Sequence, residues 1–415
     1  MNGEESCTVF AVRRTDGVGS APFGVGTDSV TPYATIFLGI LFFLIASLAP
    51  SVAGVKTQTW IVAPNDSSSP SWVKAGNGIQ AALDRAQPGD VIQLQPGVYT
   101  PTKALQTKRH GEAHRPITIK GPESGLDVSR RNEAVIIASG HVFNIDHSYY
   151  VLDGFTINGQ PDLEFADIPT APRALLAYKD KNQSRIADSR LIYIGNTARD
   201  VTGIVITNMF LTGAGGECIR MRNFTTNSKV TDSLIYRCGF VAKNKEYRYH
   251  NGEGIYIGTS PKSTDQPYHK NDGSNNNLVQ NNVIQTFAAE CVDIKENAAG
   301  NIIDSNQCLY GLGPDTANEA ILEVRGKRNQ ITNNTIQHSW GYGIKLWSDN
   351  ASSGGANIVA GNRLSNINSD VITVKKQSQP AEVCENSYAD GAPSVVSRTR
   401  ATINKICSRT YPTGL

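Results

Sequence analysis

The sequence predicts an all-β protein: a single-stranded right-handed parallel β-helix with an N-terminal capping helix. Two observations carry this prediction, a strand-like pentamer that recurs six times and the asparagine-rich phrases between its copies. Each pentamer has apolar residues at its second and fourth positions and mostly polar residues at its third and fifth. This is the period-two pattern of a strand with one face in a core. The copies are Cys218–Arg222, Gly254–Gly258, Cys291–Lys295, Ile321–Arg325, Gly343–Trp347 and Val371–Lys375.

The spacing of the copies is that of a coiled repeat. From Ile219 to Ile372, their second positions are separated by 36, 37, 30, 22 and 28 residues, in the range of solenoids with loops of variable length. Asparagine tolerates a left-handed backbone and hydrogen-bonds to its own backbone. It therefore suits tight bends between stacked strands, where its side chains can form ladders from coil to coil. Because parallel crossovers are right-handed, we expect a right-handed solenoid.

An amphipathic helix precedes the first coil. Its apolar residues recur at helical spacing, and Pro88 and Gly89 end it. Such a helix covers the edge that the first coil of a solenoid leaves unpaired. The apolar residues are Ile79, Ala82, Leu83 and Ala86.

One β-helical domain with short flanking segments is the expected organisation. Less regular strand phrases before the pentamers extend the solenoid towards the helix, and a polar insertion at about 160–200 interrupts them. The expected segments are a polar N-terminal segment at 1–33, a signal peptide or signal-anchor helix at 34–55, a linker at 56–76, the β-helix at 77–380 and a C-terminal tail or cap at 381–415.

The segment 34–55 predicts export from the cytosol. An apolar run from Ala34 to Ala49 is followed by Ser51 and Ala53, small residues that fit a cleavage site before Gly54. An uncleaved anchor that extends to Val55 is the competing interpretation. We therefore expect an extracellular protein, either secreted or anchored in a membrane with its β-helix outside the cytosol.

The cysteines fit an oxidising compartment. Without Cys7, six remain, and pairing neighbours would tie adjacent coils together. This is one of the 15 connectivities that six cysteines allow, and free buried thiols are the alternative. Five glycosylation sequons, at Asn65, Asn182, Asn223, Asn333 and Asn350, are compatible with secretion. The neighbour pairs are Cys218 with Cys238, Cys291 with Cys308 and Cys384 with Cys407.

The overall charge is nearly balanced. With 39 Lys and Arg against 37 Asp and Glu, the net charge is +2, and nothing indicates a nucleic-acid partner. A local basic groove for an acidic polymer stays open. We expect a monomer.

Stacked in register, the outward positions of the pentamers form two ladders with rungs about 4.8 Å apart. Lys295 then lies beside Arg325, and Asp293 beside Glu323. The third positions are Arg220, Tyr256, Asp293, Glu323, Lys345 and Thr373, and the fifth are Arg222, Gly258, Lys295, Arg325, Trp347 and Lys375.

Two interpretations of these ladders remain. In one, the charges are exposed and form cross-strand pairs, Asp293 with Arg325 and Glu323 with Lys295, which contribute little to stability. In the other, Arg325 lowers the pKa of Lys295, which becomes a general base, while nearby carboxylates hold a divalent cation. These are the parts that β-elimination on a polyuronate requires.

The segments 290–306 and 322–334 resemble the catalytic stretch of the β-helical polysaccharide lyases that include chondroitinase B and many alginate lyases, which have the pectin-lyase-like fold. In that family, a lysine five residues after a glutamate is the base. The resemblance implies that Lys295 is the base, that Arg325 is the acid and that Glu290 binds a cation. It also implies a metal-binding role for Asn251 and a second acid at Glu253.

Calcium is the cofactor that this resemblance implies. The family usually has a second glutamate two places before the first, where this chain has Ala288. Glu253 or Asp293 would then take that ligand's place. An acidic polysaccharide is the expected partner, and its subsites need cations and aromatic rings. The candidates are Arg220, Arg222, Tyr256, Glu323, Tyr342, Lys345 and Trp347.

Three further functions were compared with the lyase. A hydrolase on this fold would need a close set of aspartates, which the ladders lack. A uronan epimerase shares the proton abstraction and stays open. A non-catalytic carbohydrate-binding or cell-surface protein is the main alternative from another class.

Overall fold

The computed structural model describes residues 57–64, 78–122, 133–163, 169, 172–240, 252–263, 271–287, 289–311, 320–339, 341–375, 378–389, 395–397, 401–404 and 406–408. All of them fall within one compact unit, Val55–Leu415. The predicted N-terminal segment and signal or anchor helix lie outside the described residues. Within the described part of the chain, no helix combines the length and apolar character needed to span a membrane.

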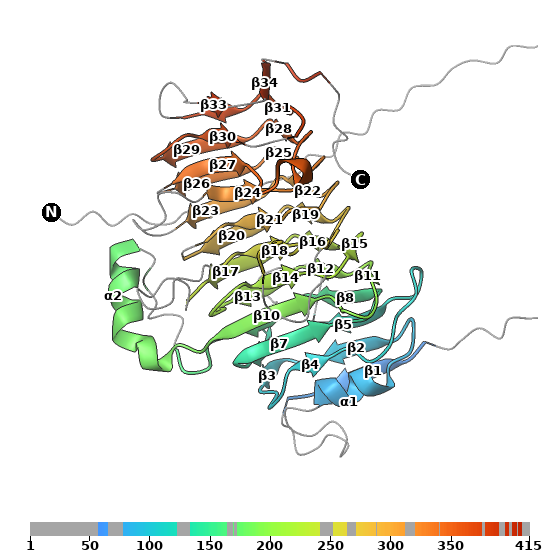
Figure 1. Ribbon diagram of the computed structural model, residues 1–415. Coiled ribbons are helices and arrows are strands. Elements are labelled where there is room, and N and C mark those ends of the chain that lie inside the picture. Colours follow the sequence, from blue (N-terminus) through green and yellow to red (C-terminus); the bar gives the residue numbers. More distant parts are fainter. Residues whose placement is uncertain are drawn as a thin grey trace, which may run out of the picture. The chain divides into compact units, whose positions relative to one another are not determined.

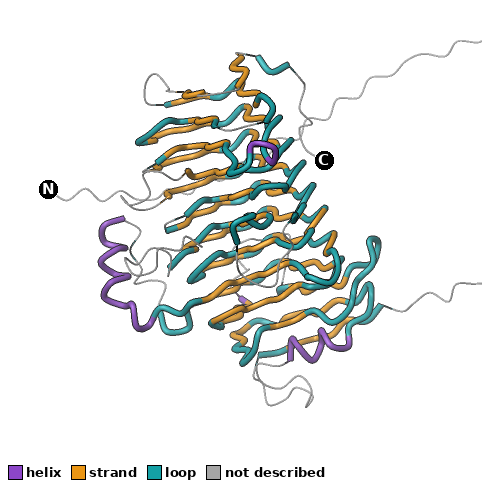
Figure 2. Tube along the Cα trace, viewed as in Figure 1, coloured by secondary structure: helices purple, strands orange, loops and turns teal. Residues whose placement is uncertain are grey.

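Three parallel sheets, A, B and C, run along the stack of coils, and from β2 onward successive strands belong to A, B and C in turn, except for β11 and β15 (Figure 1). The loops between them are seen in Figure 2. Sheet A contains β1 (Thr59–Val62), β2 (Val91–Leu94), β5 (Ile117–Lys120), β8 (Tyr150–Asp153), β12 (Val205–Thr207), β16 (Lys229–Thr231), β19 (Leu278–Gln280), β22 (Ile302–Asp304), β25 (Gln330–Thr332), β28 (Ile358–Ala360), β31 (Ala381–Cys384) and β34 (Ala401–Asn404).

Sheet B contains β3 (Gly97–Tyr99), β6 (Ala134–Ile137), β9 (Thr156–Asn158), β13 (Phe210–Thr212), β17 (Leu234–Cys238), β20 (Val283–Thr286), β23 (Gln307–Gly311), β26 (Thr335–Ser339), β29 (Arg363–Ile367) and β32 (Ser387–Tyr388). Sheet C contains β4 (Leu105–Gln106), β7 (Gly140–Ile145), β10 (Ser189–Ile194), β14 (Ile219–Met221), β18 (Ile255–Ile257), β21 (Val292–Ile294), β24 (Ala320–Val324), β27 (Tyr342–Leu346), β30 (Ile372–Val374) and β33 (Val395–Ser397). A small sheet pairs β11 (Val201–Thr202) with β15 (Thr225–Thr226).

This architecture confirms the predicted right-handed parallel β-helix. The second and fourth positions of the pentamers point into one continuous apolar core, as the period-two pattern predicts. The core ladder of the second positions runs through Ile219, Ile255, Val292, Leu322, Ile344 and Ile372.

Asparagine ladders connect the coils at two bends. At one, Asn277 donates its amide to Asn301 at 3.0 Å, and Asn301 donates to Asn329 at 3.0 Å. The other runs from Asn282 to Asn386 in the same way. These buried amides satisfy one another and the adjacent backbone, so they fix the stacking of the coils.

The ends of the solenoid differ in part from the prediction. The expected capping helix is α1 (Gly78–Arg85), which contacts β1, β2 and β4. The segment 56–76, expected as a linker, contains β1, which pairs with β2. The segment 381–415, expected as a tail or cap, contains four further strands that continue all three sheets. Both segments lacked a clear pattern because short edge strands bury only alternate residues.

The remaining helices of the described residues lie outside the stack of coils. They are α2 (Pro172–Asn182), η3 (Gln183–Arg185) and η5 (Ala351–Ser353). The first two belong to the predicted insertion at about 160–200, which also contains the sheet C strand β10.

Three disulfides link consecutive coils, and their pairing is the neighbour pairing. They join Cys218 to Cys238, Cys291 to Cys308 and Cys384 to Cys407. Such bonds are typical of oxidising compartments. Among the sequons, Asn223 is buried in the fold, so its side chain has no room for a glycan.

Candidate active site

The outer face of sheet C carries the predicted ladders. Register places the third positions in the expected order from Arg220 to Thr373. The ladder also extends in the N-terminal direction through Tyr193, Asn144 and Gln106. In each pentamer, the fifth position comes two residues after the third and projects from the same face. The third positions therefore form one row of side chains across the strands, and the fifth positions form a second row.

The middle of these ladders is buried, whereas the first of the two interpretations took these charges to be exposed. Asp293 is 1% exposed and Lys295 is 7% exposed. Arg220, Arg222, Tyr256 and Glu323 are also buried. Long side chains on adjacent rungs pack over one another, so little water reaches the charged groups. Their electrostatic interactions are therefore stronger than those of surface pairs.

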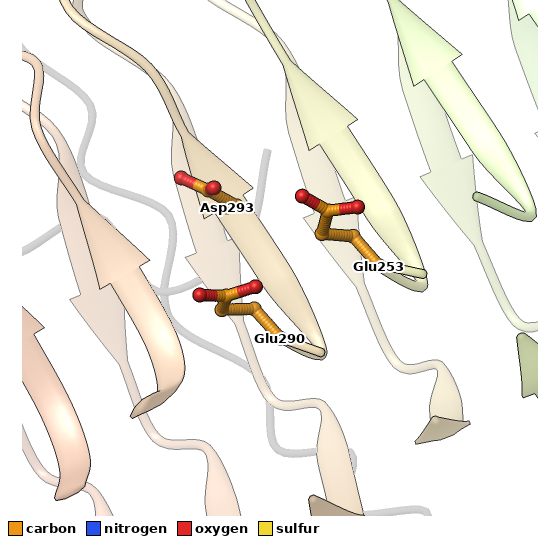
Figure 3. A group of neighbouring side chains, drawn as sticks. All are labelled: Glu253, Glu290 and Asp293. Carbon is orange, nitrogen blue, oxygen red and sulfur yellow. The ribbon is translucent and has the colours of Figure 1, made fainter. Parts of the chain in front are cut away.

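Three carboxylates meet on adjacent rungs (Figure 3). Glu253 lies just before β18, Glu290 just before β21, and Asp293 within β21. One oxygen from each lies within 4.8 Å of the others, and all three residues are buried. The structure thus brings together three of the four predicted metal ligands, while Asn251 and Ala288 lie outside the described residues.

Lys295 forms an ion pair with Asp293, and its ammonium lies 4.7 Å from the centre of the Tyr256 ring. Burial lowers the pKa of Lys295, but the charge of Asp293 outweighs burial and the net shift is upward. The predicted lowering of this pKa by Arg325 is therefore wrong for the ligand-free protein. Arg325 does lower it, but the nearer carboxylate dominates.

Arg325 binds Glu323 rather than Asp293. Its Nε donates to Glu323 Oε1 at 2.6 Å, and Lys345 Nζ lies 3.1 Å from Glu323 Oε2. The predicted cross-strand pairs, Asp293 with Arg325 and Glu323 with Lys295, are replaced by pairs of residues two apart in sequence. Such residues project from the same face of a strand, so their side chains can meet without crossing a rung.

The pKa of Glu323 reflects these contacts. Burial raises it, but Arg325, Lys345 and Lys295 together lower it to about 2. Arg325 has a raised pKa because neighbouring carboxylates, Asp293 first among them, outweigh its burial. Both side chains therefore stay charged at neutral pH.

The pKa of Glu253 is shifted in the opposite direction, upward. Burial, followed by the Glu217 and Asp293 carboxylates, raises its pKa to about 8. Lys295 only partly offsets them. In the ligand-free protein, Glu253 is therefore a neutral acid at neutral pH.

The carboxylate cluster fits a calcium ion. Buried Asp293 Oδ1 has no hydrogen-bond partner, although such oxygens nearly always have one. Calcium prefers carboxylate oxygens and accepts irregular geometry, so Glu253, Glu290 and Asp293 supply a suitable donor set.

Aromatic rings and cations contact one another along the face. The Arg325 guanidinium lies 4.4 Å from the Trp347 ring centre, and Lys345 lies 4.7 Å from the same ring. Lys345 is also 5.9 Å from the Tyr342 ring centre. The predicted substrate-binding residues thus form one connected surface with the charged cluster, which suits an anionic sugar chain.

A cavity of about 350 Å³ lies on the same face, towards the N-terminal rungs. Arg220 and Arg222 line it together with Tyr193, Asn144 and Asp146. Arg220 is paired with Glu217, which also accepts a hydrogen bond from Arg190 Nε at 2.9 Å.

Sequence reasoning missed several residues of this surface. Glu217 and Glu296 directly flank pentamers and are fully buried beside Arg220 and Arg325. Their position directly next to a pentamer could have predicted that they lie near the ladder residues. Tyr193 belongs to β10, which lies in the segment expected to be an insertion.

Comparison with known proteins supports the fold. No family model matches the chain, and no curated protein matches it by sequence. An alginate lyase from Paenibacillus sp. str. FPU-7 superposes with a TM-score of 0.61 at 19% identity, over 83% of this chain and 99% of that one. The pectate lyase Pel9A superposes with a TM-score of 0.56 at 16% identity, over 84% of this chain and 79% of that one.

An endo-xylogalacturonan hydrolase from Aspergillus tubingensis gives a TM-score of 0.51 at 13% identity, over 83% of this chain and 91% of that one. The chain therefore has the pectin-lyase-like β-helix fold. At these identities the likeness establishes the fold alone, and function depends on the site.

Proposed function

We propose that this protein is an exported polysaccharide lyase that cleaves a uronic-acid-containing polysaccharide by β-elimination. The supporting observation is that Lys295, Arg325 and the three carboxylates occupy one face of sheet C, beside further cations and aromatic rings. Two proteins of the same fold carry lyase activity on alginate and pectate in their names. Export agrees with the three disulfides.

The reaction removes a proton from the carbon next to the uronate carboxylate and breaks the bond from the neighbouring carbon to the glycosidic oxygen. The electron pair of the broken C–H bond forms a C=C bond, and the leaving oxygen receives a proton. In this proposal Lys295, in its neutral form, accepts the first proton. Arg325 donates hydrogen bonds to the leaving oxygen, and its fixed charge stabilises the negative charge that develops there, while water supplies the proton that this oxygen takes up.

A calcium ion held by Glu253, Glu290 and Asp293 would supply two effects when bound: it would neutralise the substrate carboxylate and weaken the hold of Asp293 on the Lys295 proton. Asn251 is the further ligand proposed by resemblance. The aromatic residues Tyr256, Tyr342 and Trp347 would then position sugar rings along the face.

One observation favours a second candidate, a non-catalytic protein that binds acidic glycans. Lys295 is ion-paired and has a raised pKa in the ligand-free protein, so it serves more readily as a cation than as a base. The same surface would then recognise uronates without cleaving them.

Incubation with alginate, pectate, chondroitin sulfate and dermatan sulfate, with and without calcium, separates these candidates. A lyase generates an unsaturated sugar end that absorbs in the ultraviolet. An epimerase changes the proton NMR spectrum of the polymer without that absorbance. Binding with neither change supports the non-catalytic candidate.

A further inference from the structure

We propose that Arg222 and the cavity beside it form a separate subsite for an anionic group of a sugar, either a uronate carboxylate or a sulfate ester. This inference extends the proposed function by taking the ligand to be an acidic polysaccharide. It concerns binding alone, so it does not depend on cleavage.

The cavity is built from rigid elements. Its walls come from the ladder residues Asn144, Tyr193 and Arg220 on adjacent rungs of sheet C, and Thr197 lines it from the loop after β10. Tyr193 Oη accepts a hydrogen bond from the Asn223 amide at 3.3 Å. A volume of about 350 Å³ is at the lower end of the range for small-molecule pockets and accommodates part of a sugar chain.

Arg222 lines this cavity and is 5% exposed. Its Nε makes no hydrogen bond, and among the described residues its guanidinium has no carboxylate partner. Its guanidinium lies 5.3 Å from the centre of the Tyr256 ring. Arg222 also helps to lower the pKa of Glu217, but the ion pair of that carboxylate is with Arg220. A buried cation that has no ion pair of its own destabilises a fold, so its retention indicates a ligand that supplies the charge.

Arg222 differs in this from the neighbouring cations. Arg220 is paired with Glu217, Lys295 with Asp293, and Arg325 with Glu323. These ion pairs satisfy their own charges. Arg222 forms no ion pair with a carboxylate of the described residues, and the planar fork of donors of a guanidinium binds carboxylate or sulfate oxygens in a bidentate manner.

The other charges around the cavity leave it suited to an anion. Asp146 is the acidic residue in its wall, and its Oδ1 already accepts a hydrogen bond from Thr107 at 2.6 Å and lies 2.8 Å from His147 Nδ1. His141 also lines the cavity. Burial lowers its pKa, and Arg190 and Arg220 lower it further. The fixed positive charges at the cavity are therefore those of Arg220 and Arg222.

The position of the cavity connects it to the candidate active site. Arg220 is two rungs from Asp293 on the same ladder, a separation of roughly 10 Å. A sugar chain lying across the strands would place one residue at Lys295 and the anionic group of a nearby residue against Arg222. The subsite would therefore select acidic over neutral chains.

Titration of the full chain with monosaccharides tests this without cleavage. The probes are galacturonate, glucuronate, glucose 6-sulfate and glucose, and binding is followed by ligand-detected NMR. We expect the acidic sugars to bind and glucose not to bind. Whichever binds more tightly, a uronate or the sulfate ester, identifies the anionic group that the subsite prefers. Equal binding of glucose and the acidic sugars would overturn the proposal.

Two variants and a matched control localise the binding. Arg222→Gln removes the guanidinium, and Thr197→Trp fills the cavity from an exposed loop position. Each is expected to weaken binding at least about tenfold, the loss of one charge-assisted contact. Arg363→Gln, the same charge change at an exposed position on sheet B, should leave binding unchanged. Unaltered binding in Thr197→Trp overturns the proposal even if Arg222→Gln fails to fold.

The stability of Arg222→Gln distinguishes a ligand-binding role from a structural one. Because the guanidinium forms no ion pair with a carboxylate in the described part of the chain, the variant should unfold at the same temperature as the wild type or higher in the absence of sugar. A marked loss of stability would assign Arg222 to the fold. Acidic-sugar binding through Arg222 without any polymer cleavage would keep the subsite and reject the lyase.

Discussion

Asp293, within β21, and Lys295, the residue that directly follows this strand, form a buried ion pair beside two further carboxylates. This pair determines the charge state of the candidate active site. It keeps the lysine protonated, while the other oxygen of Asp293, Oδ1, has no hydrogen-bond partner among the described residues. Changes to either member should therefore alter both stability and chemistry.

Replacing Lys295 with Ala should lower the free energy of unfolding by about 3–5 kcal/mol, because it leaves Asp293 as a buried charge without its cation. Lys295→Arg, which preserves the charge, should lower it by much less. Denaturant-induced unfolding followed by circular dichroism measures both. Lys229→Ala, at an exposed position on sheet A, is the control. Equal stability of Lys295→Ala and the control would show that the ion pair does not stabilise the fold.

The protein should become less stable in acid because Glu323 becomes protonated. Its pKa is about 2 in the folded protein and about 4.3 in an unfolded chain. A lowered folded-state pKa adds stability above the unfolded value, and this is lost as the pH falls from about 4.3 to about 2. The contribution is on the order of 3 kcal/mol. Denaturant unfolding over this range should show a weaker acid dependence in Glu323→Gln. An unchanged slope would contradict the assignment.

Glu253 should make the protein less stable as the pH rises, which is the opposite of the effect of Glu323. Its pKa is about 8 in the folded protein, so the folded state holds a proton that the unfolded chain has lost. Stability should decrease as the pH rises from about 4.3 to about 8. In chelator, Glu253→Gln should therefore be more stable than the wild type above this range. Thermal unfolding at mildly acidic and alkaline pH tests this, and a less stable variant at alkaline pH would refute it.

Calcium should raise the unfolding temperature, because it binds the folded protein and not the unfolded chain. At a concentration of 100 times its dissociation constant, the gain is about 2.7 kcal/mol. Glu290→Gln and Asp293→Asn should each abolish the shift, while Glu112→Gln, at an exposed carboxylate, should retain it. A shift that survives in Asp293→Asn would place the ion elsewhere.

The repeat made the fold predictable from the sequence. The pentamers fix which residues face the core, and a slip of one residue would expose Ile255 and bury Gly254 and Tyr256 against it. The asparagine phrases likewise predicted bends and ladders. The strand β10 was missed because its sequence, Ser189–Ile194, lies in a polar stretch and packs against neighbours that only the three-dimensional structure identifies.

The sequence predicted which residues form the candidate site better than it predicted which of them pair with one another. Register alone placed Asp293 next to Glu323 on the ladder. The choice of partners depends on side-chain rotamers and burial, so the sequence could not show that Lys295 pairs within its own strand. Nor could it show that, among the described residues, Arg222 forms no ion pair with a carboxylate while Arg220 does, because Glu217 forms its ion pairs with Arg220 and Arg190.

The most direct test of the central claim compares the wild type with Lys295→Arg on acidic polysaccharides. Arginine preserves the positive charge beside Asp293 but cannot give up a proton at accessible pH, so it cannot be the base. We predict that the wild type and Lys229→Ala release the ultraviolet-absorbing unsaturated product from at least one uronate polymer. Lys295→Arg should do so at least about 100-fold more slowly. Cleavage by Lys295→Arg at the wild-type rate, or no product from any polymer with the wild type, would contradict the account.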